Sequence, residues 1–267
     1  MSMRRCAISG SLSDDQRVLD AEVTHYLCDV LRLGHNDRFV GFDGRGMERI
    51  FRLKCEGDIT VAEGVGEVYQ GRQGAPVALC FAIPKGDKLD LVARQITELG
   101  VAELHLWSAE RSVGVWKQQK VKQKLARLER VTREASRQSG RADELMIYLP
   151  TRLQDLVIRH QHVPLRLFLD PKADHGWDHL DLSAQPLTTD DTSVEQNSGE
   201  RDLSLHDQTG LACVLIVGPE GGISPSERDQ LCEAGWRGVR LASPVLRTET
   251  AGVVACALAL DRLGYLA

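Results

Sequence analysis

The chain has 267 residues, of which 42% are hydrophobic and 27% charged, and its formal net charge is −5. These proportions are those of an ordinary globular protein with core enough for one large or two average domains. No apolar stretch approaches membrane-spanning length and the first residues, MSMRRCAISG, lack the apolar region of a signal peptide, so we expect a cytoplasmic protein without a membrane partner.

The seven cysteines are odd in number, never form a CxxC pair and mostly stand inside apolar runs. We therefore expect buried, reduced thiols rather than disulfides or metal ligands. The eight histidines are scattered without metal-ligand spacing, so no metal site is expected.

The acidic net charge comes from one segment. Residues 170–207 hold ten Asp or Glu and two Lys or Arg, whereas residues 111–141 hold ten Lys or Arg and two Glu. The acidity of the whole chain therefore does not exclude a phosphate-binding face. Within the acidic segment, the Thr, Ser, Asp, Gln and Asn content of residues 183–210 predicts a long polar insertion, which we interpret as a solvated linker.

Two patterns divide the chain. Residues 1–73 contain short apolar segments separated by Gly and Asp turns, which predicts a small antiparallel β domain with a helix at 20–33. Residues 74–267 alternate strands with helices, which predicts an α/β domain with a mostly parallel sheet and helices on its faces. The strands are expected at 38–42, 50–53, 67–69, 77–83, 103–107, 165–169, 213–217 and 239–241, and further helices after Asp87 up to Gly100 and at 117–138.

The clearest local signals surround the glycine loop after residues 213–217. That apolar, mostly β-branched run is typical of a strand buried on both faces. Gly218, Gly221 and Gly222 allow the backbone to approach a ligand closely. A helix follows with an N-cap serine, a proline at its first position, a capping-box glutamate and a terminal glycine, which are Ser224, Pro225, Glu227 and Gly235.

A second loop of this kind follows the strand expected at 239–241. It reads SPVLRTET from Ser243 and enters a helix whose apolar residues recur from Val253, with Thr248 as the expected N-cap. Open α/β sheets usually bind ligands at the carboxyl ends of adjacent strands. We therefore expect both loops to form one ligand site.

The residues of the first loop argue against a phosphate ligand. A P-loop needs Lys followed by Ser or Thr, whereas this loop offers Glu220, and the GxGxxG dinucleotide fingerprint is absent. A positively charged ligand held through backbone groups suits the loop better. Adenosylmethionine meets that description, although loop chemistry alone does not select it.

Two motifs carry a family resemblance. GPEGGISPSE followed by LRTETA resembles the signature of the ribosomal RNA small subunit methyltransferase E family, enzymes of the SPOUT class that methylate N3 of a uridine in 16S rRNA. Residues 25–46, 84–113 and 134–141 resemble further segments of that family, so the resemblance covers most of the chain. It implies a SPOUT-type trefoil-knotted parallel sheet with helices on both faces and an N-terminal PUA-like β-barrel domain that binds RNA.

The resemblance also implies a cofactor, partners and a binding set. The cofactor is S-adenosyl-L-methionine, the partner is 16S rRNA or the small ribosomal subunit, and a homodimer is expected. Backbone groups of the two loops and of strand 165–169 are expected to hold the cofactor, although the leucines are equally explained as core residues. The set is Leu169, Gly218, Glu220, Gly221, Gly222, Leu241, Ser243, Leu246 and Thr250.

The chemistry of uridine N3 suggests candidate catalytic residues. Because N3 carries a proton, an enzyme must remove that proton or stabilise the anion left behind. Arginine cannot act as the base but can hold the developing oxyanion. Arg247 is the first candidate and Arg111 the second, which is equally explained as an interdomain salt-bridge residue. Glu249 either orients Arg247, accepts the proton or only stabilises the start of its helix.

Basic residues cover the helix at 117–138 outside its core stripe. An RNA-binding face formed by Lys117, Lys120, Lys124 and Arg127 and an ordinary solvated surface agree about equally with this pattern.

Two other functions are compatible with the motifs. One is a SPOUT RNA methyltransferase acting on a ribose 2′-hydroxyl, against which the PKGDK and SGR segments and the N-terminal resemblance speak. The other is a non-catalytic RNA-binding factor in ribosome assembly, against which the intact GPEGG and LRTETA loops speak.

Overall fold

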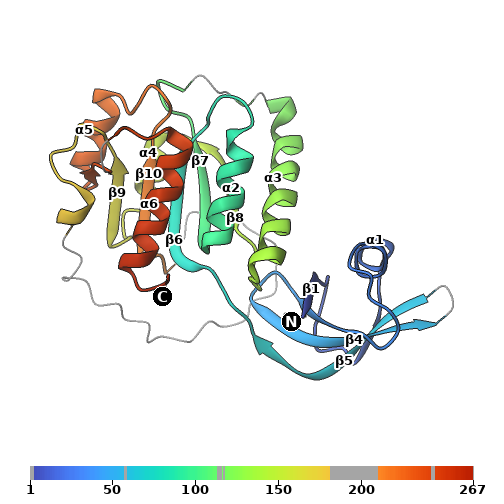
Figure 1. Cartoon of the computed structure of the whole chain (residues 1–267). Coiled ribbons are helices and arrows are strands. Elements are labelled where there is room, and N and C mark those ends of the chain that lie inside the picture. Colours follow the sequence, from blue (N-terminus) through green and yellow to red (C-terminus); the bar gives the residue numbers. More distant parts are fainter. Residues whose placement is uncertain are drawn as a thin grey trace. The chain divides into compact units, whose positions relative to one another are not determined.

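The structure is a computed structural model that describes residues 3–56, 59–112, 116, 118–180, 210–241 and 244–266 (Figure 1). Most of the predicted insertion at 183–210 therefore lies outside the described residues. The chain divides into two compact units, one formed by Met1–Ala75, Ala93–Ala102 and Ala126–Met146, the other by Pro76–Val92, Glu103–Leu125 and Ile147–Ala267. The predicted domains 1–73 and 74–267 stay a prediction, because parts of helices α2 (Lys88–Leu99) and α3 (Gln118–Ser139) group with the first unit.

A five-stranded sheet with the order β1-β3-β4-β5-β2 forms the first unit. Its strands are β1 (Arg4–Ala7), β2 (Gln16–Val18), β3 (Arg38–Phe42), β4 (Met47–Glu56) and β5 (Ile59–Gln70). The three predicted strands are confirmed as β3 and as parts of β4 and β5. The sheet is antiparallel except that β1 pairs with β3 in parallel, and the short strands β1 and β2 were not predicted.

Aromatic packing holds this sheet together. Phe39 and Phe51 are register partners on neighbouring strands, and their ring centroids lie 5.7 Å apart. Gly41 is required beside them, because a Cβ atom there would lie 2.7 Å from the ring of Phe51.

The predicted continuous helix over residues 20–33 is wrong in its second half. Asp20 caps α1 (Ala21–His25) by accepting a hydrogen bond from the Val23 amide at 2.8 Å. A π-helical turn, Tyr26–Val30, then replaces the α-helix, and Arg32 adopts a left-handed φ of 57° that ends helical structure. The turn still contributes the buried Leu27 to the core of this unit.

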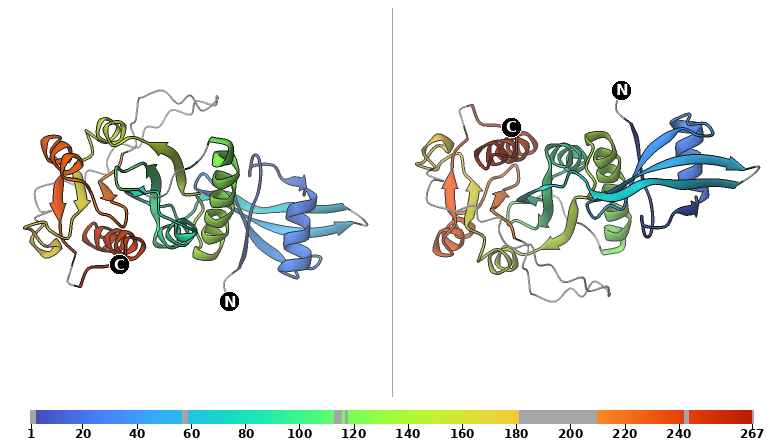
Figure 2. Two further views of the ribbon diagram at one scale, coloured as in Figure 1. Left: turned by 90° about the horizontal axis from the view of Figure 1, so that it is seen from above. Right: turned by 90° about the horizontal axis from the view of Figure 1, so that it is seen from below.

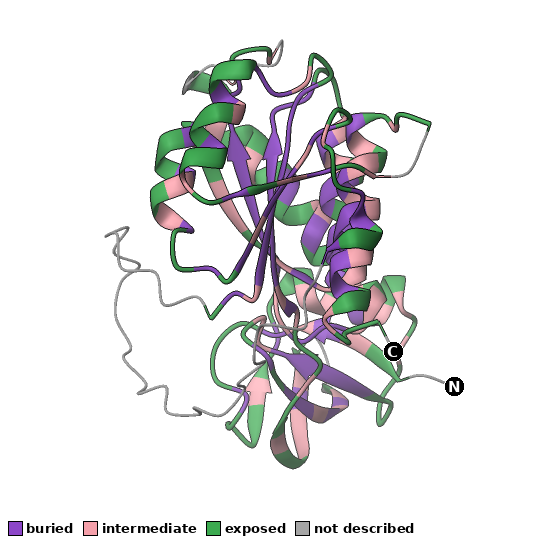
Figure 3. Cartoon of the chain, turned by 90° about the vertical axis from the view of Figure 1, so that its left-hand side faces the viewer, coloured by how far each residue is buried: buried purple, intermediate pink, exposed green. Residues whose placement is uncertain are grey.

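A six-stranded sheet with the order β11-β9-β10-β6-β7-β8 organises the second unit. The pairs β11–β9, β9–β10 and β10–β6 are parallel, as predicted. The strands are β6 (Ala75–Ala82), β7 (Val101–Trp107), β8 (Met146–Thr151), β9 (Leu165–Leu169), β10 (Cys213–Val217) and β11 (Arg237–Val239). Figure 3 shows the buried residues concentrated along these strands.

Helices cover both faces of this sheet. Successive side chains of a strand point to opposite faces, so each strand contacts helices on both sides. Ala78, Cys80 and Ala82 of β6 face the core that contains residues of α4 (Leu153–Arg159) and α5 (Pro225–Glu233). Phe81 points the other way, toward Gly252 of α6 (Thr248–Arg262), where a Cβ atom would lie 3.1 Å from its ring. Figure 2 shows α4 and α5 on one side of the sheet and α6 on the other.

The other two predicted helices with stated bounds hold with small shifts. α2 ends before Gly100, which has a φ of +94°, and α3 covers the predicted 117–138 within a residue. Strand 239–241 was predicted two residues late, because β11 ends at Val239 and Arg240 forms only an isolated bridge with Gly176. Strand β8 and helix α4 were not predicted.

All seven cysteines are free. Cys6, Cys80, Cys213 and Cys256 are buried as predicted, and burial raises the pKa of Cys6 to about 11 and that of Cys213 to about 12. Cys55 and Cys232 are exposed, contrary to the expectation of buried thiols. Within the described residues, every helix is too short or too polar to cross a membrane.

Candidate functional site

The glycine loop after β10 is held at both of its ends. At its start, Trp107 donates its indole N–H to the Val217 carbonyl at 3.2 Å. At its end the predicted capping box of α5 is confirmed: the Glu227 amide donates to Ser224 Oγ at 3.1 Å, and the Ser224 amide donates to Glu227 Oε2 at 2.8 Å. Gly235, with a φ of 79°, follows the helix as predicted.

The loop itself needs glycine for space and for conformation. A Cβ atom at Gly218 would lie 2.8 Å from Ile223 Cγ1, and Gly222 adopts a φ of 72°. Segment 110–112 supports the loop from outside, since the Glu110 amide donates to Glu227 Oε1 at 2.8 Å. Hydrogen bonds from Ser224 and Ser226 lower the pKa of the Glu110 carboxyl.

The second loop enters α6 one residue earlier than predicted. Arg247 is the N-cap, with an extended φ and ψ of −63° and 151°, so Thr248 is the first helical residue and the predicted Thr248 cap is wrong. The cap makes no side-chain hydrogen bond. Glu249 in the first turn places a negative charge where the helix dipole favours it.

The two strands that lead into these loops are not neighbours, contrary to the prediction. β9 lies between β10 and β11 and pairs with both. The carboxyl end of β9 therefore borders the candidate site together with the two loops. β9 ends at Leu169, and Asp170 follows directly. The order of the strands in the sequence could not show that β9 lies between β10 and β11. A long segment separates β9 from β10 in the chain.

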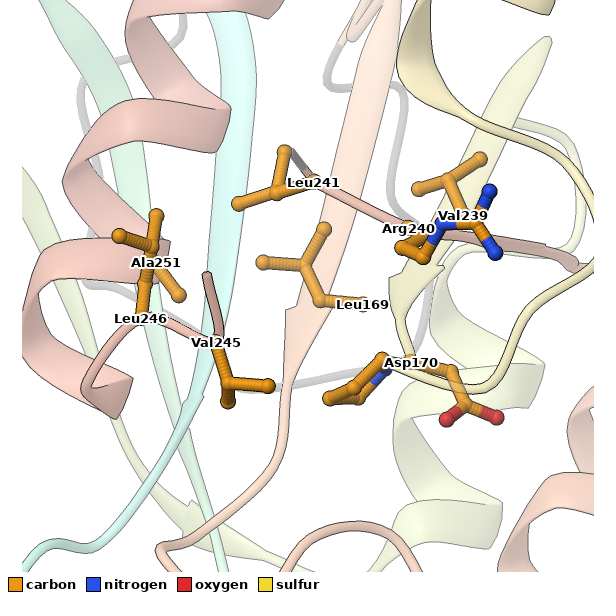
Figure 4. A pocket seen from close by; sticks show the side chains of 9 residues that line it. Leu169, Asp170, Val239, Arg240, Leu241, Val245, Leu246 and Ala251 are labelled. Carbon is orange, nitrogen blue, oxygen red and sulfur yellow. The ribbon is translucent and has the colours of Figure 1, made fainter. Parts of the chain in front are cut away.

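A pocket of about 140 Å³ lies where β9 and β11 end. Figure 4 shows the side chains of Leu169 and Leu241 next to each other in this pocket, while Val245, which also lines it, is exposed. The lining is mostly apolar and comprises Leu169, Asp170, Pro171, Val239, Arg240, Leu241, Val245, Leu246 and Ala251. A small apolar pocket with few polar groups suits a flat ring system. The rest of such a ligand would extend beyond the pocket.

Asp170 is the buried polar group of this pocket. One of its carboxylate oxygens lies 2.7 Å from Arg228 Nη2 of α5, and the other accepts the Lys172 amide at 2.9 Å. The carboxylate is therefore fixed in place and keeps its charge balanced by a guanidinium.

The structure brings three of the predicted cofactor residues together in the pocket, namely Leu169, Leu241 and Leu246. The others are placed differently. Thr250 is exposed on α6 beside the pocket residue Ala251, Ser243 lies outside the described residues, and Gly218, Glu220, Gly221 and Gly222 belong to the loop after β10 and do not line the pocket.

Charged contacts connect the two loops outside the pocket. Lys88 Nζ lies 3.0 Å from Glu220 Oε1 of the first loop and 3.2 Å from Glu249 Oε2 of α6. The hydrogen bond from Lys88 lowers the pKa of Glu220, and the bond to Glu220 raises the pKa of Lys88. Glu249 therefore pairs with Lys88, a contact that was not among its predicted roles.

The two candidate catalytic arginines differ in their surroundings. Arg111 donates from Nη1 to the Gly221 carbonyl at 3.1 Å, so its side chain contacts the first loop. Arg247 stands at the start of α6 with an exposed side chain.

The candidate RNA-binding residues lie on α3. Lys120, Lys124 and Arg127 are exposed there, while Lys117 lies outside the described residues. Lys124 Nζ lies 5.2 Å from the centre of the Trp116 ring, a cation–π contact that holds this lysine near the start of the helix.

Sequence reasoning missed Lys88, Glu110 and Asp170. Lys88 lies in the PKGDK segment that contributed to the family resemblance, and Asp170 directly follows a predicted strand, so both positions carried a signal. Their partners could not be read from the sequence, because Lys88 and Glu220 are 132 residues apart.

Comparison with known proteins agrees with this architecture. The family model of RNA methyltransferase domains matches residues 72–260. Ribosomal RNA small subunit methyltransferase E of Mycobacterium bovis is 31% identical over 180 residues, 67% of this chain and 61% of that protein. The chain thus matches less than two thirds of this relative's length. The Bacillus subtilis protein of the same name is 25% identical over 245 residues, covering 89% of this chain and 86% of that one.

A solved structure extends the comparison to the fold of the chain. Ribosomal RNA small subunit methyltransferase E from Neisseria gonorrhoeae, bound to S-adenosyl methionine, superposes with a TM-score of 0.77 over 98% of both chains at 24% identity. The matched family model and the relatives agree with the family resemblance of the two loops. The chain therefore belongs to the RNA methyltransferase domain family, and it is similar to proteins named ribosomal RNA small subunit methyltransferase E.

Proposed function

We propose that this chain uses S-adenosyl-L-methionine to methylate N3 of a uridine in the 16S rRNA of the small ribosomal subunit. The observation that carries the proposal is the apolar pocket at the ends of β9 and β11, bordered by the LRTETA segment, in a chain whose relatives bear the name of that methyltransferase. The pocket suits a purine and its surroundings suit a cation.

The residues present fit this cofactor. Leu169, Leu241 and Leu246 offer apolar surfaces on which an adenine packs, and the glycine loop offers backbone groups for its polar parts. Glu220 and Glu249 carry two negative charges against the single positive charge of Lys88, and the remaining negative charge favours a ligand with positive charge. Gly218, Gly221, Gly222, Ser243 and Thr250 complete the proposed binding set.

Arg247 is the proposed catalytic residue. When bound, the cofactor supplies an electrophilic methyl group on its sulfonium. As the uridine N3–H loses its proton, negative charge spreads to the neighbouring carbonyl oxygens, and an exposed guanidinium at the start of α6 can stabilise it. Arg111, held by the Gly221 carbonyl, is the second candidate for this role. Glu249 is proposed either to accept the N3 proton or to orient Arg247.

The finer features of the fold belong to the same proposal. We propose that the second unit contains the trefoil knot of SPOUT enzymes and that the first unit is a PUA-like barrel that binds RNA. The family resemblance of the motifs supports both, and the likeness to the Neisseria gonorrhoeae structure over 98% of the chain supports a shared fold. An rRNA substrate implies the cytoplasm as the place of action, and activity is expected to survive chelation of metal ions.

A homodimer through α6 is also proposed. Val254, Ala257 and Leu258 of this helix are only half-buried in the single chain, although its opposite face packs on β10. A helix that is apolar all round is normally buried on all sides, which a second copy would achieve.

Methyl transfer to RNA tests the proposed function. Purified protein is incubated with radiolabelled adenosylmethionine and either 16S rRNA or small subunits from a strain that lacks the protein, and the nucleosides are identified by mass spectrometry. The proposal predicts one 3-methyluridine. A 2′-O-methylated nucleoside would instead identify a ribose methyltransferase, and cofactor binding without transfer to either RNA would identify a non-catalytic assembly factor.

A further inference from the structure

Lys88 joins two segments that are far apart in sequence. Its ammonium group lies within 3.2 Å of carboxylate oxygens of both Glu220, in the loop after β10, and Glu249, in the first turn of α6. Both segments border the proposed cofactor site. One cation therefore pairs with two carboxylates, and the three groups together keep one net negative charge.

The position of Lys88 in its own helix does not explain its presence. Lys88 is the first residue of α2, where the helix dipole favours negative charge and disfavours a lysine. The side chain keeps about a third of its surface exposed, whereas that of Glu249 is 13% exposed. Lysine at this position therefore stabilises contacts outside the helix.

We propose that Lys88 is a positioning residue that holds the loop after β10 and the start of α6 in the arrangement that binds the cofactor. This inference rests on the proposed function. Without the ammonium group, Glu220 and the largely buried Glu249 would repel each other and the two segments would move apart. The Lys88 ammonium group between the two carboxylates holds the two segments together. This contact keeps the pocket and Arg247 in their places.

Cofactor affinity measured by titration calorimetry tests this role. Lys88→Met is expected to weaken adenosylmethionine binding about tenfold or more, the range for loss of a charged hydrogen bond, whereas Lys88→Arg retains most of it. Lys85→Met, which removes an exposed lysine from the same segment, is the control and should bind like the wild type. Circular dichroism and the thermal unfolding midpoint establish that all variants fold.

Two further measurements separate charge neutralisation from general structural damage. The Lys88→Met/Glu220→Gln double variant removes one side of the repulsion and should regain most of the lost affinity. High salt should also restore affinity to Lys88→Met by screening the carboxylates. Affinity of Lys88→Met within twofold of the wild type, or a double variant no better than the single one, overturns the role of Lys88. Absence of binding by the wild type instead overturns the proposed function.

Discussion

Arg247 and Arg111, the two proposed catalytic arginines, differ in the surroundings of their side chains. Arg111 already donates to the Gly221 carbonyl at 3.1 Å, so part of its hydrogen-bonding capacity serves the loop. Arg247 is exposed at the start of α6, and in the proposed mechanism its guanidinium turns toward the uridine. A group that acts on the developing oxyanion contributes to the rate rather than to cofactor affinity.

Replacement of Arg247 by alanine is therefore expected to lower kcat for RNA methylation by about 10²- to 10³-fold, the usual cost of losing one oxyanion donor. The Kd for adenosylmethionine should change by less than about twofold, because the pocket side chains are untouched. Arg237→Ala, which removes an exposed arginine of β11, is the control. An equal loss of cofactor affinity and rate in Arg247→Ala would make Arg247 a binding-loop residue.

Glu103 is a buried carboxyl group away from the candidate site. It accepts a hydrogen bond from, or shares a proton with, His105 Nε2 at 2.7 Å, and the His105 ring stacks on Tyr148. Burial raises the pKa of Glu103 from 4.5 to about 7, only partly opposed by Arg159. Burial also lowers the pKa of the neighbouring His160 to about 3, which keeps that ring neutral.

The raised pKa of Glu103 predicts a pH-dependent stability. A carboxyl whose pKa is higher in the folded state stabilises the fold fully below pH 4.5, and this contribution is lost as the pH rises through about 7. Glu103→Gln should remove a loss of up to about 3 kcal/mol in the free energy of unfolding between pH 5 and pH 8. Urea unfolding at several pH values measures it, and parallel pH profiles for variant and wild type would contradict the assignment.

The sequence predicted individual helices and strands better than it predicted which of them lie next to each other. The capping box at Ser224 and Glu227 depends on residues three apart, so the start of α5 could be predicted from sequence. The edge strand β8 has no buried residue and hence no clear periodicity, which explains why it was missed. The placement of β9 between β10 and β11 and the reach of Lys88 to Glu220 are tertiary contacts, which local pattern does not contain.

Arg141 connects several elements of the first unit. It is buried, and its guanidinium binds both Asp143 carboxylate oxygens at 2.9 and 3.1 Å and the carbonyls of Val101 and Thr97 at 2.7 and 3.2 Å. Asp143 in turn accepts the Gly74 amide at 3.0 Å. The arginine of the SGR segment thus serves the fold of this unit.

Removal of this buried charge should destabilise the protein strongly. Arg141→Met is expected to lower the free energy of unfolding by about 3 to 5 kcal/mol, because Asp143 and two carbonyls lose their donor in a buried place. Arg133→Met, which breaks the exposed contact with Glu144, should cost less than about 1 kcal/mol. Chemical denaturation compares the two, and similar small losses would show that Arg141 is dispensable for the fold.

At the scale of the whole molecule, charge is distributed unevenly along the chain. α3 carries exposed Lys120, Lys124 and Arg127, whereas most of the acidic segment at 170–207 lies outside the described residues. A helix with so few acidic residues attracts polyanions even in a protein with a net charge of −5. This agrees with the candidate RNA-binding face on α3.

Removal of this charge should weaken RNA binding and reduce its dependence on salt. Replacing Lys117, Lys120, Lys124 and Arg127 together by alanine is expected to lower the slope of log K against log salt by about 0.7 to 0.9 for each phosphate that is no longer neutralised. Filter binding between low and moderate salt measures the slope, with Lys172→Ala/Arg262→Ala as the control. An unchanged slope would remove α3 from the RNA interface.

Titration of the folded protein with adenosylmethionine tests most directly whether the pocket at the ends of β9 and β11 is the cofactor site. We predict saturable heat for the wild type and none for Leu246→Arg, whose side chain would fill the apolar pocket. A folded wild type that produces no heat, or a Leu246→Arg variant that binds equally well, would contradict the account.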